Sequence, residues 1–506
     1  MKLKVKNIPL RLEHSSAMIS PDDAAELGLI VGDRVKITYG KKFCVSDVNI
    51  ATGMVDQGEI GICMTAGPCE IEIPDGVDVE IYPVSKPKSI EYIKKKMEGK
   101  KLTKEEVHAI VRDIVTNMLT EVELTAFVMS NYLQQVDIDE IEWLTEAMID
   151  TGETLTFERG IVVDKHSIGG VPGNKISLLV VPIIAASGLL IPKTASRAIT
   201  SGSGTADTME VLADVNLGID EIKEITESVG GVIAWGGATN IAPADDKIIK
   251  VEHPLSIDPR PQLLASVMAK KGSIGAKHIV IDVPVGEGSK VVDVEQGRTL
   301  STDFSELGRR MGLEVACVMT YGGQPVGRTI GPALEAREAL KVLEDAKGPR
   351  SLVEKATGVA GVLLEMAGKS RNGAEYANKL IESGKALEKF KQIVEAQGGD
   401  PEITSQDIPV GTYKYEVKAP VDGAVAVVDN SKLVKVARAA GAPKDKGAGI
   451  VLHKKGGQHV KAGSSLFTIY AEKEWKLDQA VELATPEPPL TVSSMILERY
   501  PSYRVL

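Results

Sequence analysis

The hydrophobic pattern changes its period several times along the chain, and each change predicts a domain. Over residues 1–84, apolar and polar residues alternate in short runs such as LKVKNIPL, GDRVKITYG and VDVEIYPV. Alternation of this kind is typical of half-buried β-strands. Between these runs, SPDDAAELGL predicts one short helix, with Ser20 as its cap and Pro21 in its first turn. We therefore expect residues 1–84 to form a β-rich, barrel-like domain.

Residues 88–152 have the period of helices instead. In LTKEEVHAIVRDIVTNML, Thr103 and Glu106 form a capping-box signature. The apolar positions that follow recur in steps of three and four, which places them on one stripe of a helix; they are Val107, Ile110, Val111, Ile114, Val115, Met118 and Leu119. LTAFVMSNYL and IDEIEWLTEAMI predict two further helices, so we expect a small helical domain here.

Between residues 153 and 405 the patterns of strands and helices alternate. GIVVDKHS and KHIVIDVPVG are apolar runs typical of buried strands, whereas KISLLVVPIIAASG and RPQLLASVMAKKG have the length and composition of helices. This alternation predicts a large α/β domain with helices covering a sheet. The break QGGDPEITSQDIPVG precedes a last strand-rich region, residues 411–506, for which we expect an α+β or β-sandwich-like domain.

Composition narrows the class of protein. The chain has 506 residues, and its 43% hydrophobic and 25% charged content is that of a globular protein. The net charge of −11 argues against a general nucleic-acid-binding protein, which needs a basic face. No apolar run is long enough for a membrane helix, and the start of the sequence has no signal-peptide core. Because the cysteines lack zinc-site spacing, we expect a cytoplasmic protein with reduced thiols at Cys44, Cys63, Cys69 and Cys317.

Two segments of the α/β region carry glycine-rich loops suited to anions. IVVDKHSIGGVPGNKIS, residues 161–177, leaves a predicted strand through Lys165, His166 and Ser167 into such a loop. TASRAITSGSGTADTME, residues 194–210, is rich in hydroxyl groups and in glycines that let backbone N–H groups converge on an anion. We expect the helix that follows the second loop to add its positive end to this field.

Two further segments add charged groups to the same region. IDPRPQLLASVMAKK, residues 257–271, carries Asp258 and places Ser266 and Lys270 on one face of a helix. DVPVGEGSK, residues 282–290, carries Lys290 after a strand. Any one of these segments could be an ordinary turn or a solvated lysine. Because strand ends in α/β sheets meet at one edge, the four segments together predict a phosphate site there.

Other classes of protein match parts of the sequence. GGVPGNKIS approaches a P-loop, with Asp282 at the end of HIVIDV as its Walker B carboxylate, but Asn174 precedes Lys175 and Ile176 follows it where the motif requires G-K-[ST]. No G-x-G-x-x-G follows a strand, which argues against a dinucleotide-dependent redox enzyme. KAPVDGAV resembles the start of a lipoyl-type carrier domain but lacks the lysine hairpin of such domains.

Taken in order, the four segments resemble the signature segments of the thymidine and pyrimidine-nucleoside phosphorylases. The similarity rests on VDKHSIGGVPGNKISL, SRAITSGSGTAD, LLASVMAKK and VIDVPVGEGS, and it extends from about residue 88 to the C-terminus. The N-terminal unit resembles a double-psi β-barrel module. That unit, together with VPGNKIS and SRAITSGSGT, is most similar to the archaeal branch of the family, which acts on nucleoside 5′-monophosphates.

The resemblance implies a pentosyltransferase that works by phosphorolysis. AMP and phosphate would give adenine and ribose 1,5-bisphosphate, with CMP and UMP as further substrates, in a nucleotide-salvage route that feeds a RuBisCO. The family fold implies a helical domain completed by a later piece at about 244–275, an active site in the cleft between this domain and the α/β domain, and a homodimer or larger homo-oligomer. We expect no metal, no organic cofactor, and no nucleic-acid or membrane partner.

The same resemblance assigns roles to individual residues. It implies phosphate contacts, which suit a dianion as one point charge with several donors, from Lys165, Ser167, Ser177, Ser196 and Thr205. Asp258 would be the proton donor, and Lys270 and His166 further catalytic groups. Nucleotide contacts are implied for Gly170, Ser196, Arg197, Ala198, Ile199, Thr200, Ser201, Thr205, Ser266 and Lys290.

One departure from the family pattern bears on the base. The pyrimidine-specific enzymes carry an arginine upstream of the serine that corresponds to Ser266, and this chain has Val251 at that position. A side chain that reads a pyrimidine carbonyl is therefore missing, which favours a purine. A pyrimidine-nucleoside or thymidine phosphorylase remains the alternative function, followed by a P-loop NTPase.

Overall fold

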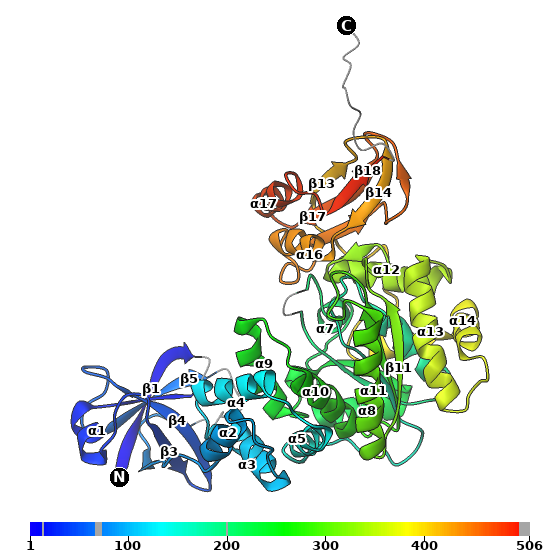
Figure 1. The fold of residues 1–506 in the computed structure, drawn as a ribbon. Coiled ribbons are helices and arrows are strands. Elements are labelled where there is room, and N and C mark those ends of the chain that lie inside the picture. Colours follow the sequence, from blue (N-terminus) through cyan, green and yellow to red (C-terminus); the bar gives the residue numbers. More distant parts are fainter. Residues whose placement is uncertain (13–14, 66–72, 199–200, 495–506) are drawn as a thin grey trace. The chain divides into compact units, whose positions relative to one another are not determined.

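The computed structural model describes residues 1–12, 15–65, 73–198 and 201–494. The chain divides into two compact units, Met1–Thr151 with Pro243–Leu263, and Gly152–Ala242 with Leu264–Leu506 (Figure 1). Each unit is therefore assembled from two separate stretches of chain. Among the described residues, no helix has both the length and the apolar character that crossing a membrane requires.

The first unit begins with a closed β-barrel. Its strands, in the order β1-β5-β2-β4-β3-β6, are β1 (Lys2–Leu12), β2 (Ser16–Ile19), β3 (Arg34–Tyr39), β4 (Lys42–Ile50), β5 (Glu59–Thr65) and β6 (Asp78–Pro83). Alternate residues such as Leu3, Val5 and Ile37 are buried, because successive side chains of a strand face opposite sides. Helix α1 (Pro21–Leu27) is capped by Ser20, whose Oγ accepts a hydrogen bond from the N–H of Asp23 at 3.1 Å. The predicted N-terminal barrel is confirmed.

The rest of the first unit is a helical bundle. Its helices are α2 (Ser89–Met97), α3 (Lys104–Val115), α4 (Glu121–Leu133), α5 (Ile138–Asp150) and α9 (Pro243–Leu255). The capping box predicted at Thr103 begins α3. Although α9 is distant in sequence, it contacts α3, α4 and α5. The predicted later piece, 244–275, is divided, because residues from Leu264 onward belong to the second unit.

The second unit is built on parallel strands. They are β7 (Val163–Ser167), β8 (Ile191–Ala195), β9 (Gly231–Trp235), β10 (His278–Val285) and β11 (Glu314–Tyr321). One sheet has the order β11-β10-β7, another contains β8 and β9, and a parallel bridge between Val162 and Leu190 connects them. Because all these pairings are parallel, the carboxyl ends of the strands lie at one edge. The predicted α/β domain is confirmed.

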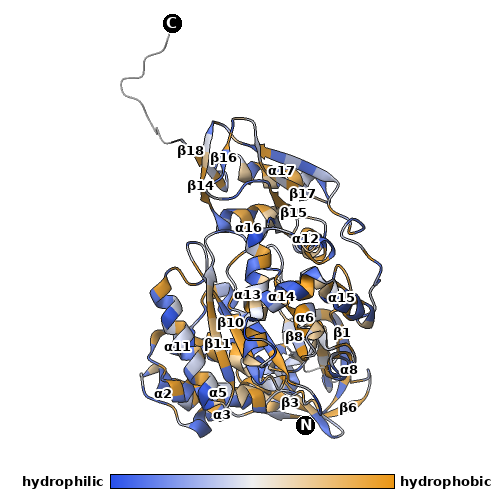
Figure 2. Cartoon of the chain, turned by 90° about the vertical axis from the view of Figure 1, so that its right-hand side faces the viewer, coloured by the Kyte–Doolittle hydropathy of each residue, from blue (hydrophilic) through white to orange (hydrophobic). Residues whose placement is uncertain are grey.

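The helices that contact the strands of this sheet include α6 (Ser177–Ala186), α8 (Ile219–Val229), α11 (Val294–Arg310) and α13 (Arg350–Met366). Three further helices, α12 (Pro332–Asp345), α14 (Gly373–Glu382) and α15 (Lys385–Ala396), pack against α6, and α10 (Arg260–Ser273) precedes β10 in the chain. Helix α6 contacts α13, α15 and β9 and is apolar all round, as expected for a helix inside a core. Figure 2 shows the mainly apolar strands β10 and β11 and the mixed colours of α11, which buries only one stripe of its surface.

The C-terminal region is α+β, as predicted. Its elements are β13 (Tyr413–Lys418), β14 (Gly423–Val428), α16 (Asn430–Ala439), β15 (Gly449–Leu452), β16 (His459–Val460), β17 (Ser465–Ala471), α17 (Glu474–Ala484) and β18 (Leu490–Ser493). They form the sheets β12-β15-β17-β13 and β16-β14-β18. Because β12 (Thr329–Ile330) precedes α12 in sequence, its pairing with β15 ties this region to the α/β part of the unit.

A buried ion pair joins helices α2 and α5 of the bundle. The Lys96 ammonium lies 2.9 Å from each carboxylate oxygen of Glu140 and 2.9 Å from the carbonyl oxygen of Gln135. Both charged side chains are almost completely buried. The pair therefore neutralises two charges that the bundle core could not hold singly.

Lys96→Met tests this pair. The substitution leaves the Glu140 carboxylate buried without its cation, so we expect the free energy of unfolding of the bundle to fall by about 3–5 kcal/mol, measured by urea denaturation followed by circular dichroism. The matched control is Lys100→Met, which removes only the exposed pair with Glu98 and is expected to leave the midpoint unchanged. Equal midpoints for the two variants would contradict the importance of the buried pair.

Candidate active site

The carboxyl edge of the sheet brings the charged residues of β7 and β10 side by side. Ser167 pairs in register with Asp282, and Lys165 with Val280. Because side chains alternate along a strand, Lys165, Ser167 and Asp282 share one face of the sheet, and Asp164 and His166 lie on the other. Strand β7 therefore supplies polar and charged side chains to two separate environments, one on each face of the sheet.

Lys165 is a buried cation with no direct partner. Its side chain is 3% exposed, and among the described residues no hydrogen bond or ion pair reaches its ammonium group. Burial lowers its pKa to about 8, and the charges of Asp282 and Asp164 offset only part of this effect. A buried ammonium in this condition is stabilised by any anion that binds beside it.

Two serine hydroxyls lie at the ends of the loop that follows β7. Ser167 Oγ accepts a hydrogen bond from Nδ2 of Asn174 at 2.9 Å. Ser177, the first residue of α6, is fully buried, and its Oγ has no hydrogen-bond partner among the described residues. Since buried hydroxyls are normally paired, the Ser177 hydroxyl is a donor available to a ligand. Lys165 and these two serines, for which the sequence predicts phosphate contacts, thus come from one strand, β7, and from the first residue of the helix that follows its loop.

Lys175, in the same loop, has a different role from that of a P-loop lysine. Its ammonium is 2.7 Å from Oε2 of Glu338 and also donates to the carbonyl oxygens of Val326 (3.1 Å) and Thr329 (3.2 Å). The side chain is fully buried in this oxygen shell. A P-loop lysine must instead reach the phosphates of a nucleotide. The P-loop interpretation is therefore wrong, because tertiary contacts occupy the lysine on which it depends.

The hydroxyl-rich loop after β8 is closed by its own carboxylate. The helix that follows, α7 (Thr205–Met209), is only five residues long, and Oδ2 of Asp207 accepts hydrogen bonds from the N–H groups of Ala198 (2.6 Å) and Gly204 (3.0 Å). The sequence predicted that backbone N–H groups of this loop would bind an anion from outside the protein, such as phosphate. Asp207 thus takes the place of the expected anion at the start of α7, and the expectation that this helix end serves a ligand is corrected.

Of the other predicted residues of this loop, Arg197 is bound by a carboxylate of the protein, and Ser196 is exposed to solvent. Arg197 makes two hydrogen bonds to the Glu210 carboxylate (2.7 and 2.5 Å), and this pairing lowers the pKa of Glu210 to about 2. The Arg197 guanidinium also lies over the ring of Trp235, 4.8 Å from its centre. Ser196 is exposed, and Ser201 and Thr205 are half-buried. Ile199 and Thr200 lie outside the described residues, as does Cys69.

Gly170 and Lys290 come together although they are distant in sequence. Gly170 has φ +87°, and a Cβ there would lie 2.6 Å from the backbone nitrogen of Lys290. Only glycine allows this approach, because a side chain would collide with the backbone. Both residues are exposed. The structure therefore unites two of the residues assigned to nucleotide binding.

On the opposite face of β7, helix α10 supplies the charged side chains that lie closest to Asp164 and His166. Lys271 forms a buried ion pair with Asp164, and Nζ of Lys193 lies 3.8 Å from the same carboxylate. Burial, followed by the charges of Lys271, Lys193 and Lys270, holds the pKa of His166 well below its usual value, so its imidazole is neutral. Ser266 and Lys270 are half-buried on α10. A neutral imidazole beside such groups can hydrogen-bond to a heterocyclic base.

Asp258 belongs to a different unit of the chain from these residues. It lies between α9 and α10, is exposed, and belongs to the first unit, whereas the other predicted site residues belong to the second. No group of three or more metal-binding side chains occurs within the described ranges.

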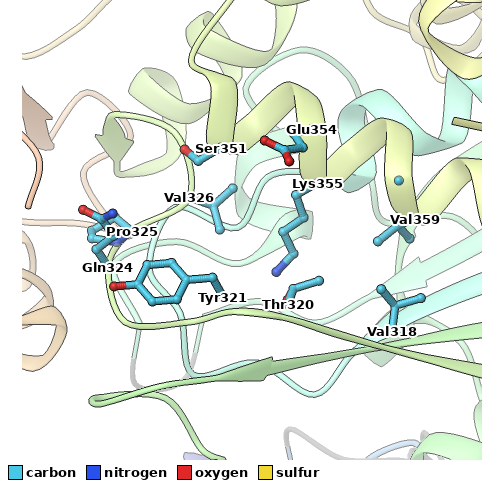
Figure 3. Close-up of a pocket in the computed structure, with 11 residues that line it drawn as sticks. Val318, Thr320, Tyr321, Gln324, Pro325, Val326, Ser351, Glu354, Lys355 and Val359 are labelled. Carbon is cyan, nitrogen blue, oxygen red and sulfur yellow. The ribbon is translucent and has the colours of Figure 1, made fainter. Parts of the chain in front are cut away.

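A cavity of about 360 Å³ lies beside the site but contains none of the predicted residues (Figure 3). It lies between the end of β11 and α13, and Lys355 reaches across it toward Thr320. Sequence reasoning missed Lys355, as it missed Lys193 and Lys271, because single lysines in helices and strands carry no motif. Asn174 and Asp282 stood within segments already singled out, but only as parts of a P-loop.

Comparisons with known proteins agree with this architecture. Residues 90–152 match the helical bundle domain of the glycosyl transferase family, residues 159–387 its α/β domain, and residues 424–487 the C-terminal domain of pyrimidine nucleoside phosphorylase. A solved anthranilate phosphoribosyltransferase from Thermus thermophilus is similar in fold, with a TM-score of 0.52, 20% identity, and coverage of 61% of this chain and 99% of that one.

Relatives of full length are much more similar. AMP phosphorylase 1 of Archaeoglobus fulgidus is 63% identical over 500 residues, and AMP phosphorylase 2 of the same organism is 52% identical over 501 residues. The AMP phosphorylase of Methanocella arvoryzae is also 52% identical over 501 residues. Each alignment covers 99% of both chains. With its helical bundle, its α/β domain and its phosphorylase-type C-terminal domain, the chain belongs to the AMP phosphorylase family.

Proposed function

We propose that this chain cleaves nucleoside 5′-monophosphates with inorganic phosphate, converting AMP and phosphate to adenine and ribose 1,5-bisphosphate. The observation that carries the proposal is the buried ammonium of Lys165, which no hydrogen bond or ion pair from the described residues reaches, on the same strand-and-loop segment as the hydroxyls of Ser167 and Ser177. The AMP phosphorylases that are 51–63% identical to this chain support the same reaction. CMP and UMP are proposed as further substrates, in a cytoplasmic salvage route that feeds a RuBisCO.

The proposed mechanism separates two charges. Phosphate attacks C1′ of the ribose while the base leaves, so positive charge develops on the sugar and negative charge on the base. Lys165 holds the phosphate, with Ser167, Ser177, Ser196 and Thr205 as donors. Positioning two reactants in this way can supply about 7–11 kcal/mol. No metal and no organic cofactor takes part in this proposal, and the working form is a homodimer or larger homo-oligomer.

On the other face of β7, the base would be held by His166, Ser266 and Lys270. The neutral imidazole of His166 can accept or donate a hydrogen bond without placing a further positive charge beside Lys270. Asp258 would deliver a proton to the leaving adenine. Val251 lies in the bundle, buried on α9, and an apolar side chain there offers no contact for a pyrimidine carbonyl. A pyrimidine-nucleoside phosphorylase is therefore not favoured.

A paired assay tests the function and the 5′-phosphate site together. With phosphate present and no added metal, we expect wild-type protein to release adenine from AMP much faster than from adenosine. Lys290→Ala should reduce this preference by about 10- to 100-fold, because it removes a charged contact that only AMP can make. The exposed Lys277 provides the control Lys277→Ala. Equal losses for AMP and adenosine would exclude Lys290 from the 5′-phosphate site, and release from nucleosides alone would overturn the function.

Lys165 predicts how phosphate use depends on pH. Its ammonium loses its proton as the pH rises through about 8, so the KM for phosphate should increase above that pH. Lys165→Met should raise the KM for phosphate by about 10- to 100-fold at pH 7 and abolish this dependence. Lys277→Met serves as the control. A Lys165→Met enzyme with the phosphate KM of the wild type would remove Lys165 from the site.

The proton-donor role of Asp258 can be tested by comparing substrates whose leaving groups do and do not need a proton. Asp258→Asn should lower kcat with AMP by about 10²–10⁴-fold, because general acid catalysis of the departing base is lost. A nucleotide whose leaving group needs no proton should recover most of the rate. The control is Asp220→Asn, which changes an exposed carboxylate on α8. Unchanged turnover of AMP by Asp258→Asn would rule out the proton-donor role.

A further inference from the structure

Asp282 is a completely buried carboxylate held by three side chains. Lys355 Nζ lies 2.8 Å from Oδ2, Thr320 Oγ1 donates to Oδ1 at 2.6 Å, and Asn174 Nδ2 donates to Oδ2 at 3.4 Å. Burial alone would raise the pKa of Asp282, but Lys355, the hydrogen bond from Thr320 and the charge of Lys165 hold it below its ordinary value. The side chain is therefore ionised, and it can only accept hydrogen bonds.

The charge of Asp282 fixes the orientation of the Asn174 amide. Because the carboxylate only accepts, the amide must turn its NH₂ group, and not its oxygen, toward Asp282. The same NH₂ group donates to Ser167 Oγ at 2.9 Å. Ser167 is thus the acceptor in this contact, and its own hydroxyl proton is left to point elsewhere. A hydroxyl oriented in this way is a donor for an anion.

We infer that Asp282 and Asn174 are positioning residues, which make Ser167 a hydrogen-bond donor to phosphate through the chain of contacts Lys355–Asp282–Asn174–Ser167. This inference rests on the proposed function, which it extends beyond the residues that touch phosphate. The outer end of the chain is held by Lys355 and Thr320, which line the cavity of Figure 3. Neither residue is among those predicted to bind substrate.

Asp282 has a second effect, on the charge of Lys165. The charged groups that act on Lys165 are Asp282 of β10 and Asp164 of β7, which favour its ammonium form, and Lys355 of α13 and Lys271 of α10, which oppose it. Asp282 is the strongest of the four. Removing its charge should therefore lower the pKa of Lys165 below 8 and weaken phosphate binding at a lower pH.

Two substitutions of Asn174 test the hydrogen bond that it donates. Asn174→Ala should raise the KM for phosphate by about tenfold, with little change in the KM for AMP. Asn174→Leu keeps nearly the volume of the side chain and adds no charge beside Asp282, but it cannot donate, so its phosphate KM should rise about as much as that of Asn174→Ala. A purely structural role predicts instead that the variant of similar volume is clearly the milder one. Asn378→Ala, which removes an amide on α14, is the control.

The pH profile tests the electrostatic part. Asp282→Asn would leave Lys355 buried beside a neutral group, so the double variant Asp282→Asn, Lys355→Met is made in parallel to keep the pair uncharged. In the single variant, the rise in phosphate KM should begin at a lower pH than in the wild type; in the double variant the shift should have the same direction but be smaller, because the opposing charge of Lys355 is also removed. A profile that coincides with the wild type would overturn this part of the inference.

The outcomes separate this inference from the proposed function. If Lys165→Met leaves the phosphate KM unchanged, the phosphate site itself is misassigned. If Lys165→Met weakens phosphate but both Asn174 variants keep the wild-type KM, the site stands and the positioning chain is refuted. Weakening by all three substitutions, to a similar extent for Asn174→Leu and Asn174→Ala, supports both.

Discussion

At the carboxyl edge of the sheet, more lysines than carboxylates are buried, and this imbalance of charge is the constraint on which the rest of the site depends. Lys165, Lys193 and Lys271 are buried close to Asp164 and Asp282. Burial holds the pKa of Lys193 well below its usual value and that of Lys165 at about 8, which shows that the protein alone does not fully stabilise these cations. An anion of charge −2 would supply the missing negative charge. The affinity for phosphate that we propose is thus the consequence of an incomplete internal charge balance.

Because successive side chains of a β-strand point to opposite faces of the sheet, the charged groups of β7 are divided between two environments. Asp164 and His166 point to one side of β7, where the ion pair with Lys271 and the neutral imidazole form a surface suited to a base. Lys165 and Ser167 point to the other side, where Asp282 orders the groups around the anion. One residue of register would exchange the two sides. The parallel pairing of β7 with β10 therefore fixes which side chains of β7 lie with Asp282 and which lie with Lys271, and in the proposed reaction the two sets would meet at the carboxyl edge, where the ribose C1′ must lie.

Loops that resemble anion sites in sequence can be filled by the protein itself. The donors at the start of α7 are taken by Asp207, and Arg197 is bound to Glu210. In the same way, Lys175 is enclosed by Glu338 and backbone oxygens. These internal contacts fix the loops in place without substrate. The groups left open, above all Ser177, are the ones that geometry assigns to a ligand.

The sequence by itself determined the elements, the order of the domains and the segments that carry the chemistry. Periods of two and of three to four residues identified the barrel, the bundle and the α/β region, because side-chain burial follows those periods directly. The glycines, hydroxyls and Lys165 could be assigned to an anion site because their chemistry is local. The capping residues Ser20 and Thr103 were predictable for the same reason.

Only the tertiary structure decided which charged side chains are already paired with other groups of the protein. Lys175 and Arg197 looked as available as Lys165, but acids far away in sequence, or on the next turn of chain, neutralise them. The roles of Asp282 and Lys355 depend on a contact between a strand and a helix separated by more than seventy residues. Electrostatic pairing acts through space, between residues that no local pattern connects, so their roles became visible only when the strands and helices were packed together.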